Sequence, residues 1–163
     1  MGTGRPPALS HIGPRGEAQM VDVSAKGDTA RVARATGSIR MAAATLAAIV
    51  NNTVKKGDVA TVARLAGIMA AKRTSELIPL CHSIPLTDVQ VTVSCDDALP
   101  GLRVEAIVRT VGKTGVEMEA MTAAAVTLIT VYDMAKALDR AMVISDVRLE
   151  EKAGGRSGHW RRL

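Results

Sequence analysis

VQVTVSCDDALPGLRVEAIV, residues 89–108, carries the clearest secondary-structure pattern of the chain. Apolar residues occupy every second position from Val89 to Cys95, and again from Leu102 to Val108. A period of two is typical of half-buried strands. The segment DDALPG between the two runs is rich in turn-forming residues. The stretch therefore predicts an antiparallel β-hairpin.

Helical patterns flank this hairpin on both sides. Upstream, Asp58 is a good N-cap for a helix of about Val59 to Leu77, which Pro79 prevents from continuing. Downstream, the segment GKTG, residues 112–115, precedes a long helix to about Leu138 that is apolar on most sides, so we expect it to be buried. The outer elements are a strand from Thr29 to Met41, a helix from Ala42 to Asn51 and a strand from Val143 to Leu149.

The resulting order is strand, helix in two pieces, two strands, helix, strand. It matches the split βαβ, ferredoxin-like arrangement, which predicts an α+β fold with an antiparallel sheet and helices packed on one face. With 163 residues the chain has the size of one domain. We expect a single catalytic domain over residues 21–160, preceded by a flexible arm over residues 1–20, which are rich in glycine and proline.

Composition restricts the classes of partner. The net charge of +5 favours an anionic ligand, but Tyr132 and Trp160 are the only aromatic residues. Proteins that bind single-stranded nucleic acid commonly stack bases on aromatic side chains. A phosphorylated small molecule is therefore expected in place of a nucleic acid. The many alanines favour close approach between neighbouring elements.

The cysteines and the ends of the chain indicate the compartment. Cys81 and Cys95 form neither a disulfide framework nor a C-x-x-C zinc motif. The first residues lack the apolar run of a signal peptide, and no segment resembles a membrane span. We expect a cytoplasmic protein with no membrane association and no metal site.

Several residues are candidates for chemistry. Asp133 and Lys136 lie one turn apart in the apolar segment VYDMAK. Burial would raise the pKa of Asp133 and lower that of Lys136, whereas their mutual attraction opposes both shifts. Such a pair suits proton transfer, and a structural ion pair is an equal alternative. Cys81 and His82 are adjacent, so on an extended segment they face opposite ways and cannot form a thiolate–imidazole pair.

Basic residues recur near glycines and helix ends. The segment GKTG fails the P-loop pattern because Ile107 stands where the first glycine is required. Arg156 lies in GGRSG, where the backbone can approach a phosphate closely. The remaining clusters are Lys55 with Lys56, and Lys72 with Arg73. Each cluster alone is typical of solvated surface, and together they supply cations for a triphosphate.

Seven segments occur together in one family. They are MVDVSAK (20–26), KKGD (55–58), GIMAAKRT (67–74), LIPLCH (77–82), KTGVEMEA (113–120), VYDMAKA (131–137) and GGRSG (154–158). In this order they resemble the cyclic pyranopterin monophosphate synthase family of molybdenum-cofactor biosynthesis, from about Leu9 to Trp160. Two departures are Ser83, where the family usually has proline, and Arg156, where lysine is common.

The resemblance implies a ferredoxin-like lyase that assembles as a homohexamer, a trimer of dimers. It implies conversion of 3′,8-cyclo-7,8-dihydroguanosine 5′-triphosphate to cyclic pyranopterin monophosphate with release of diphosphate. No organic cofactor is expected, and Mg²⁺ with the triphosphate stays open. By resemblance the catalytic residues are Asp133, Lys136 and Lys56. The substrate contacts are Leu80, Cys81, His82, Met118 and Glu119, with Glu117, Lys72, Arg73, Lys152 and Asp22 as further candidates and Arg156 as a phosphate ligand.

One geometric inference is independent of the family. Glu119 and Asp133 are fourteen residues apart on one helix, which separates their backbones by about 21 Å at 1.5 Å per residue. They cannot contact one reacting atom within a single chain. We therefore expect an active site shared across a subunit interface. The alternatives are a ferredoxin-like module that binds RNA or a regulatory ligand without catalysis, and an inactive structural subunit of the same family.

Overall fold

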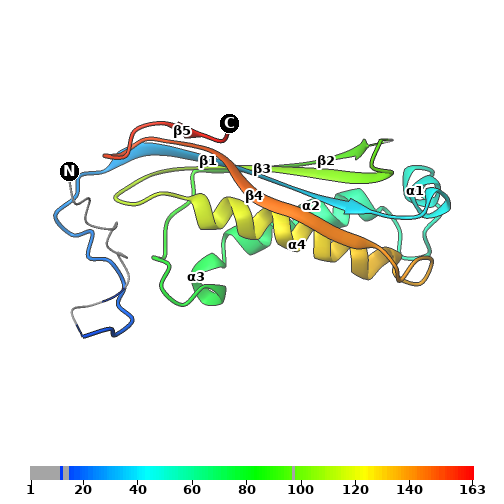
Figure 1. Ribbon diagram of the computed structural model, residues 1–163, viewed down its shortest axis with the longest axis horizontal. Helices are drawn as coiled ribbons and strands as arrows, with labels where there is room; N and C mark the ends of the chain where they lie inside the picture. Colours follow the sequence, from blue (N-terminus) through cyan, green and yellow to red (C-terminus); the bar gives the residue numbers. More distant parts are fainter. Residues whose placement is uncertain (1–11, 13–14, 97) are drawn as a thin grey trace, which may run out of the picture.

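The computed structural model describes residues 12, 15–96 and 98–163 (Figure 1). Its elements are β1 (Thr29–Arg40), α1 (Ala43–Val50), α2 (Val59–Ala71), α3 (Thr74–Leu77), β2 (Asp88–Asp96), β3 (Gly101–Gly112), α4 (Glu117–Ala135), β4 (Val143–Ala153) and β5 (Trp160–Arg161). Most of the predicted N-terminal arm, residues 1–11, 13 and 14, lies outside the described residues. Among the described helices, none has the length and apolar character needed to cross a bilayer.

The strands form one antiparallel sheet in the order β2-β3-β1-β4-β5. The predicted hairpin is β2–β3, with Val89 opposite Val108 and Cys95 opposite Leu102. The helices α2 and α4 lie together on one face of the sheet and run in opposite directions (Figure 1). The ferredoxin-like α+β prediction is confirmed, since β1 and β3 are central and the helices follow β1 and β3.

Small residues bring the helices close to the sheet and to each other. The core is built largely from alanine and valine of β1, β3 and α4, with Ala35, Ala106 and Leu128 almost completely buried. At Gly67 of α2 an added Cβ would lie 2.1 Å from Thr127 Oγ1 of α4. Only a glycine permits this approach, so the backbones of α2 and α4 pass close together.

Two helix ends differ from the predicted ones. The predicted helix 59–77 divides into α2 and α3 at Arg73, whose φ of −115° and ψ of 14° leave the helical path. The hydroxyl of buried Thr74 donates to the carbonyl of Ala71 at 3.0 Å across this junction. The long helix ends at Ala135 rather than near Leu138. Residues of the following turn leave the helical path, and Asp139 accepts a hydrogen bond from the backbone N–H of Ala42 at 2.8 Å.

The end of the chain extends the sheet further than predicted. The strand β4 continues to Ala153, four residues beyond the predicted end at Leu149. The chain then turns through Gly154 to Gly158 and returns as β5, in which Trp160 pairs with Lys152. Lys152 and the GGRSG turn therefore come next to the beginning of β1.

Candidate functional site

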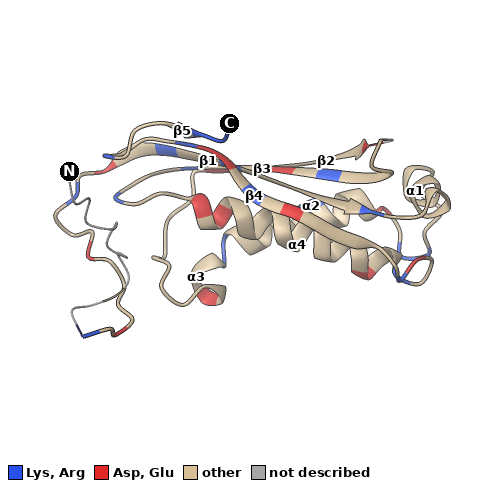
Figure 2. Ribbon diagram, in the orientation of Figure 1, with Lys and Arg blue, Asp and Glu red and all other residues tan. Residues whose placement is uncertain are grey.

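Most of the predicted site residues form two groups at opposite ends of the α2–α4 helix pair. Lys56 precedes α2 and contacts Asp133 in the last turn of α4. We call Lys56, Asp133 and Lys136 the Asp133 cluster. At the other end of α4, near α3, the first turn of α4 carries acidic residues (Figures 1 and 2). These residues border a cavity. We call this cavity, which is lined by residues 80–82, 84, 114, 115 and 117–119, the Glu119 cavity.

In the Asp133 cluster one carboxylate lies between two amines. Asp133 Oδ1 is 2.7 Å from Lys136 Nζ, and Asp133 Oδ2 is 2.7 Å from Lys56 Nζ. The Lys56 amine also donates to the main-chain carbonyl of Asp133 at 2.9 Å. The hydrogen bonds from Lys136 and Lys56, with their charges, lower the pKa of Asp133 to about 2. Asp133 is therefore ionised at neutral pH.

The expectation that Asp133 is buried is wrong for the single chain. Its side chain is 53% exposed, and Lys136 is 51% exposed. The reason is the position of the helix end: Asp133 lies in the final turn of α4, and Lys136 is the C-cap residue. Attraction to the two amines, rather than desolvation, sets the pKa of Asp133. The helix α4 is also less buried than expected, since the side chain of Ile129 is exposed.

The Glu119 cavity gathers six of the predicted substrate contacts. It has a volume of about 230 Å³ and is lined by Leu80, Cys81, His82, Glu117, Met118 and Glu119, together with residues of the 112–115 loop. Lys152 of β4 reaches the same place, where its amine is 2.9 Å from Glu117 Oε1. The structure thus brings together residues from three distant segments. Their roles toward a substrate remain a prediction.

Glu119 is the one almost completely buried carboxyl group of the described chain, with 3% of its surface exposed. Desolvation, assisted by the nearby charge of Glu117, raises its pKa to about 7. At neutral pH a substantial fraction of Glu119 therefore keeps its proton. A carboxyl group in this state can donate a hydrogen bond or a proton to a ligand.

This pKa predicts a pH-dependent stability difference for Glu119→Gln. Between the unfolded pKa of 4.5 and the folded pKa of about 7, folded protein binds more protons, so stability falls as pH rises. Glutamine does not ionise. We expect Glu119→Gln to equal the unmodified protein near pH 4.5 and to exceed its unfolding free energy by up to about 3 kcal/mol above pH 7.

Urea denaturation across pH 4.5–8.5 measures this difference. The control is Glu76→Gln in α3, whose side chain is exposed. The difference in unfolding free energy between Glu119→Gln and Glu76→Gln should therefore increase from pH 4.5 to pH 7. If the unfolding free energies of Glu119→Gln and Glu76→Gln change with pH in the same way, the pKa of Glu119 is not raised in the folded protein.

Cys81 and His82 line the same cavity. The segment is irregular rather than extended strand, so strand alternation does not apply to it. The two residues still form no activated pair. Burial raises the pKa of the Cys81 thiol, and His82 Nε2 lies 2.8 Å from the carbonyl oxygen of Val21. This contact fastens the segment before β1 to the cavity wall.

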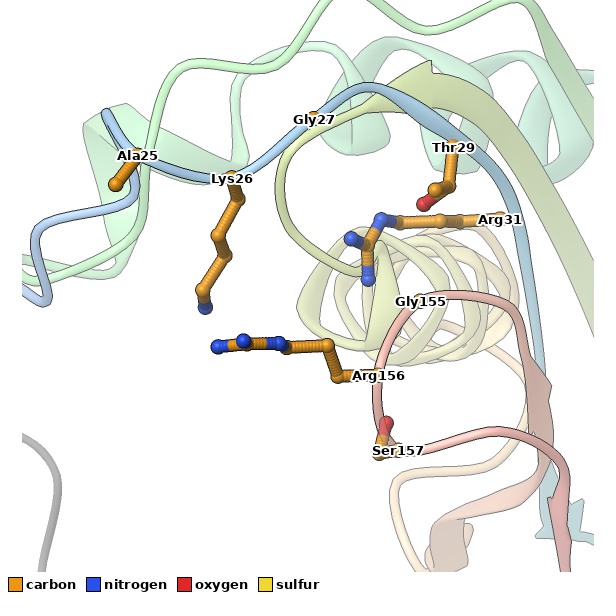
Figure 3. Close-up of a pocket in the computed structure, with 8 residues that line it drawn as sticks. All are labelled: Ala25, Lys26, Gly27, Thr29, Arg31, Gly155, Arg156 and Ser157. Atoms are coloured by element: carbon orange, nitrogen blue, oxygen red, sulfur yellow. The ribbon is translucent and has the colours of Figure 1, made fainter.

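The other predicted residues are placed as follows. Asp22 accepts a hydrogen bond from the Ser24 N–H at 2.8 Å, which lowers its pKa. Lys72 and Arg73 are exposed at the junction of α2 and α3, and the structure does not bring them to Arg156 in a described cavity. Arg156 lines a different cavity together with Lys26 and Arg31 (Figure 3).

Sequence reasoning missed Lys26 and Arg31. Lys26 ends the quoted segment MVDVSAK, which is a signal that could have found it. Arg31 lies inside β1 with no distinctive neighbours, and only the pairing of β1 with β4 brings it to the GGRSG turn.

Comparison with known proteins identifies the family. The MoaC family model matches residues 20–155. The chain belongs to the MoaC family. This match includes all the predicted site residues except Arg156, which lies one position beyond it.

Curated relatives of this MoaC-family chain carry one name. Proteins of Brucella ovis, Brucella melitensis biotype 2 and Brucella abortus, each named cyclic pyranopterin monophosphate synthase, are 59% identical to it over 152 residues. The aligned region covers 93% of this chain and 92% of each relative. The similarity therefore extends over the whole fold and both groups of site residues.

Proposed function

We propose that this MoaC-family chain is a lyase that converts 3′,8-cyclo-7,8-dihydroguanosine 5′-triphosphate to cyclic pyranopterin monophosphate and diphosphate, a step of molybdenum-cofactor biosynthesis. The observation that carries the proposal is the 59% identity to synthases over 93% of the chain. The structure supports it with two groups of ionisable residues suited to proton transfer. A binding module without catalysis would not require a carboxylate held between two lysines.

The reaction opens a purine, closes a pterin and forms a cyclic phosphate without net oxidation. Such steps require proton donors, proton acceptors and cations that hold phosphates. In the proposal, ionised Asp133 accepts protons, while the amines of Lys56 and Lys136 donate protons or stabilise developing negative charge. Glu119 supplies a protonated carboxyl group near neutral pH. The walls of the Glu119 cavity contact the substrate.

The proposed active site combines the two groups from different subunits. Within one chain they lie at opposite ends of α4, whose 19 residues span about 28 Å at 1.5 Å per residue. The Asp133 cluster is also half exposed in the single chain. A second copy that covers it with its Glu119 cavity would complete the site and restrict water. We propose a homohexamer built as a trimer of dimers, as the family resemblance implies.

The proposal includes no organic cofactor, because the reaction is redox-neutral, and it includes no membrane or nucleic-acid partner. Whether Mg²⁺ accompanies the triphosphate is answered by assaying with and without a chelator. We further propose a cytoplasmic location, supported by two cysteines that remain free.

Release of diphosphate from the cyclised GTP intermediate tests the proposal, with unmodified GTP as the control substrate. We expect stoichiometric diphosphate and a product with the mass of cyclic pyranopterin monophosphate from the intermediate, and neither from GTP. Tight binding of the intermediate without diphosphate release would instead support the binding-module alternative.

A further inference from the structure

Two stretches of the chain meet beside the Asp133 cluster. One is the turn after α4, residues 136–142, which begins with Lys136 of the cluster. The other is residues 42–56, which contains α1 and ends at Lys56 of the cluster; we call it the Lys56 segment. Figure 1 shows α1 and the turn between α4 and β4 at the same end of the molecule. The relative position of these two stretches therefore decides whether Lys56 reaches Asp133.

The turn after α4 is fastened to the helix it follows. The N–H of Leu138 donates to the carbonyl of Ala135 at 2.8 Å, and the hydroxyl of Tyr132 donates to the carbonyl of Arg140 at 3.2 Å. The side chain of Met142, at the end of the turn, is buried. The turn therefore keeps a fixed position relative to the last turn of α4.

The start of the Lys56 segment is not stabilised by its own side chains. The helix α1 has eight residues, and no side chain of its N-cap residue, Ala42, accepts a hydrogen bond from it. Alanine is a poor N-cap, and a helix of this length is not stable by itself in water. Leu46 and Ile49 bury the apolar side of α1. The start of α1 therefore depends on a polar group from elsewhere in the chain.

Asp139 supplies this polar group from the turn after α4. Its Oδ2 accepts the N–H of Ala42 at 2.8 Å, and its Oδ1 accepts the N–H of Ala141 at 2.8 Å. One carboxylate thus joins the Lys56 segment to the turn, and its charge lies at the end of α1 where the helix dipole favours an anion. Within the described part of the chain, no basic side chain lies within 4 Å of Asp139. Backbone contacts therefore account for its position.

The two stretches are joined at both ends of the Lys56 segment. At its start, Asp139 binds Ala42. At its end, the amine of Lys56 donates to the main-chain carbonyl of Asp133 at 2.9 Å and to Asp133 Oδ2 at 2.7 Å. Fixing one end of a segment reduces the conformational entropy that is lost when the other end is fixed. Loss of the contact at Ala42 should therefore leave Lys56 away from Asp133 more often.

We propose that Asp139 is a positioning residue of the Asp133 cluster, and that its hydrogen bond with the N–H of Ala42 holds Lys56 against Asp133. The inference rests on the proposed function, because it requires that Lys56 acts in the reaction. It assigns a role to a residue that lies outside all seven segments of the family resemblance. Asp139 acts through Lys56 and needs no contact with the substrate.

Two variants break this hydrogen bond from opposite sides. Asp139→Ala removes the acceptor. Ala42→Pro removes the donor and keeps the carboxylate, and the φ of −63° at Ala42 is the value that proline requires. If the hydrogen bond is the cause of the effect, the double variant should behave like either single variant.

The reactivity of the Lys56 amine reports its position without turnover. The assembled protein is treated with an acetyl N-hydroxysuccinimide ester, and mass spectrometry measures acetylation of Lys56 relative to its exposed neighbour Lys55. We expect the ratio of the Lys56 rate to the Lys55 rate to rise about fivefold in Asp139→Ala and in Ala42→Pro, the factor that corresponds to the loss of one hydrogen bond.

Steady-state kinetics with the cyclised GTP intermediate measures the consequence for catalysis. We expect kcat to fall about fivefold in Asp139→Ala and Ala42→Pro, with KM within about twofold, because the walls of the Glu119 cavity are unchanged. The matched control is Asp88→Ala in β2, which also removes a partly exposed aspartate with two hydrogen bonds, here from Gln90 and Arg109. It should leave both the acetylation ratio and kcat unchanged.

The outcomes separate this inference from the proposed function. An unchanged acetylation ratio in both variants would overturn the inference even if kcat falls. A raised ratio with unchanged kcat would overturn the role of Asp139 in catalysis. A raised ratio in a protein that releases no diphosphate would retain the positioning of Lys56 and overturn the proposed function. If Asp139→Ala fails to fold, Ala42→Pro still decides the question.

Discussion

Asp133→Asn is expected to lower kcat for diphosphate release by about a thousandfold or more, within the range of general acid–base catalysis, while the protein stays folded. Asparagine keeps the shape of the side chain but loses the negative charge that orders Lys56 and Lys136. The change removes a proton acceptor and two ion pairs together. Because these pairs are about half exposed, their loss should alter stability little.

Steady-state kinetics and thermal denaturation of Asp133→Asn measure the two effects separately. The matched control is Asp88→Asn in β2, which also removes a partly exposed aspartate from an ion pair, here with Arg109. Asp88→Asn should retain full activity. Near-normal turnover by Asp133→Asn would remove Asp133 from the mechanism, and unfolding of the variant would contradict the structural argument.

The fold followed from local patterns in the sequence. The alternation over residues 89–108 and the apolar helix after the GKTG segment placed the hairpin and α4 correctly. The break between α2 and α3 could not be predicted in this way, because it lies in the backbone dihedrals of one residue, Arg73, inside a continuous helical pattern. Helix ends depend on such single residues, whereas helix existence is set by periodicity.

The candidate site was also predicted only in part, because sequence motifs identify residues but not their contacts or exposure. Motifs identified residues of both groups, since glycines, acids and lysines cluster there in sequence. The exposure of Asp133 was misjudged because it depends on where α4 ends, not on the apolar character of the surrounding segment. Arg31 was missed because it lies in none of the quoted motifs, and only long-range pairing, in which Val32 pairs with Ala153, brings Gly155 next to its guanidinium.

Oligomers that contain both Glu119→Gln and Asp133→Asn chains are expected to regain activity that neither variant has alone. Glu119→Gln and Asp133→Asn should each be nearly inactive alone, whereas hybrids formed from equal amounts should recover about a quarter of the unmodified activity. If every site takes Glu119 from one subunit and Asp133 from another, each of these two subunits has the required residue in about half of the cases. Random mixing therefore gives an intact pair in about one site in four. Restoration arises because one chain cannot place both groups within reach of one atom, given about 21 Å along α4.

The hybrids require two differently tagged chains, denatured and refolded together or co-expressed, and purified through both tags so that every assayed oligomer contains both variants. Mixing Glu119→Gln with the double variant Glu119→Gln/Asp133→Asn is the control, because no arrangement of these chains contains an intact Glu119. It should stay inactive. If verified hybrids of the two single variants are equally inactive, each site draws both residues from one chain. The substrate must then bridge the length of α4 within a subunit, which the separation of the two groups argues against.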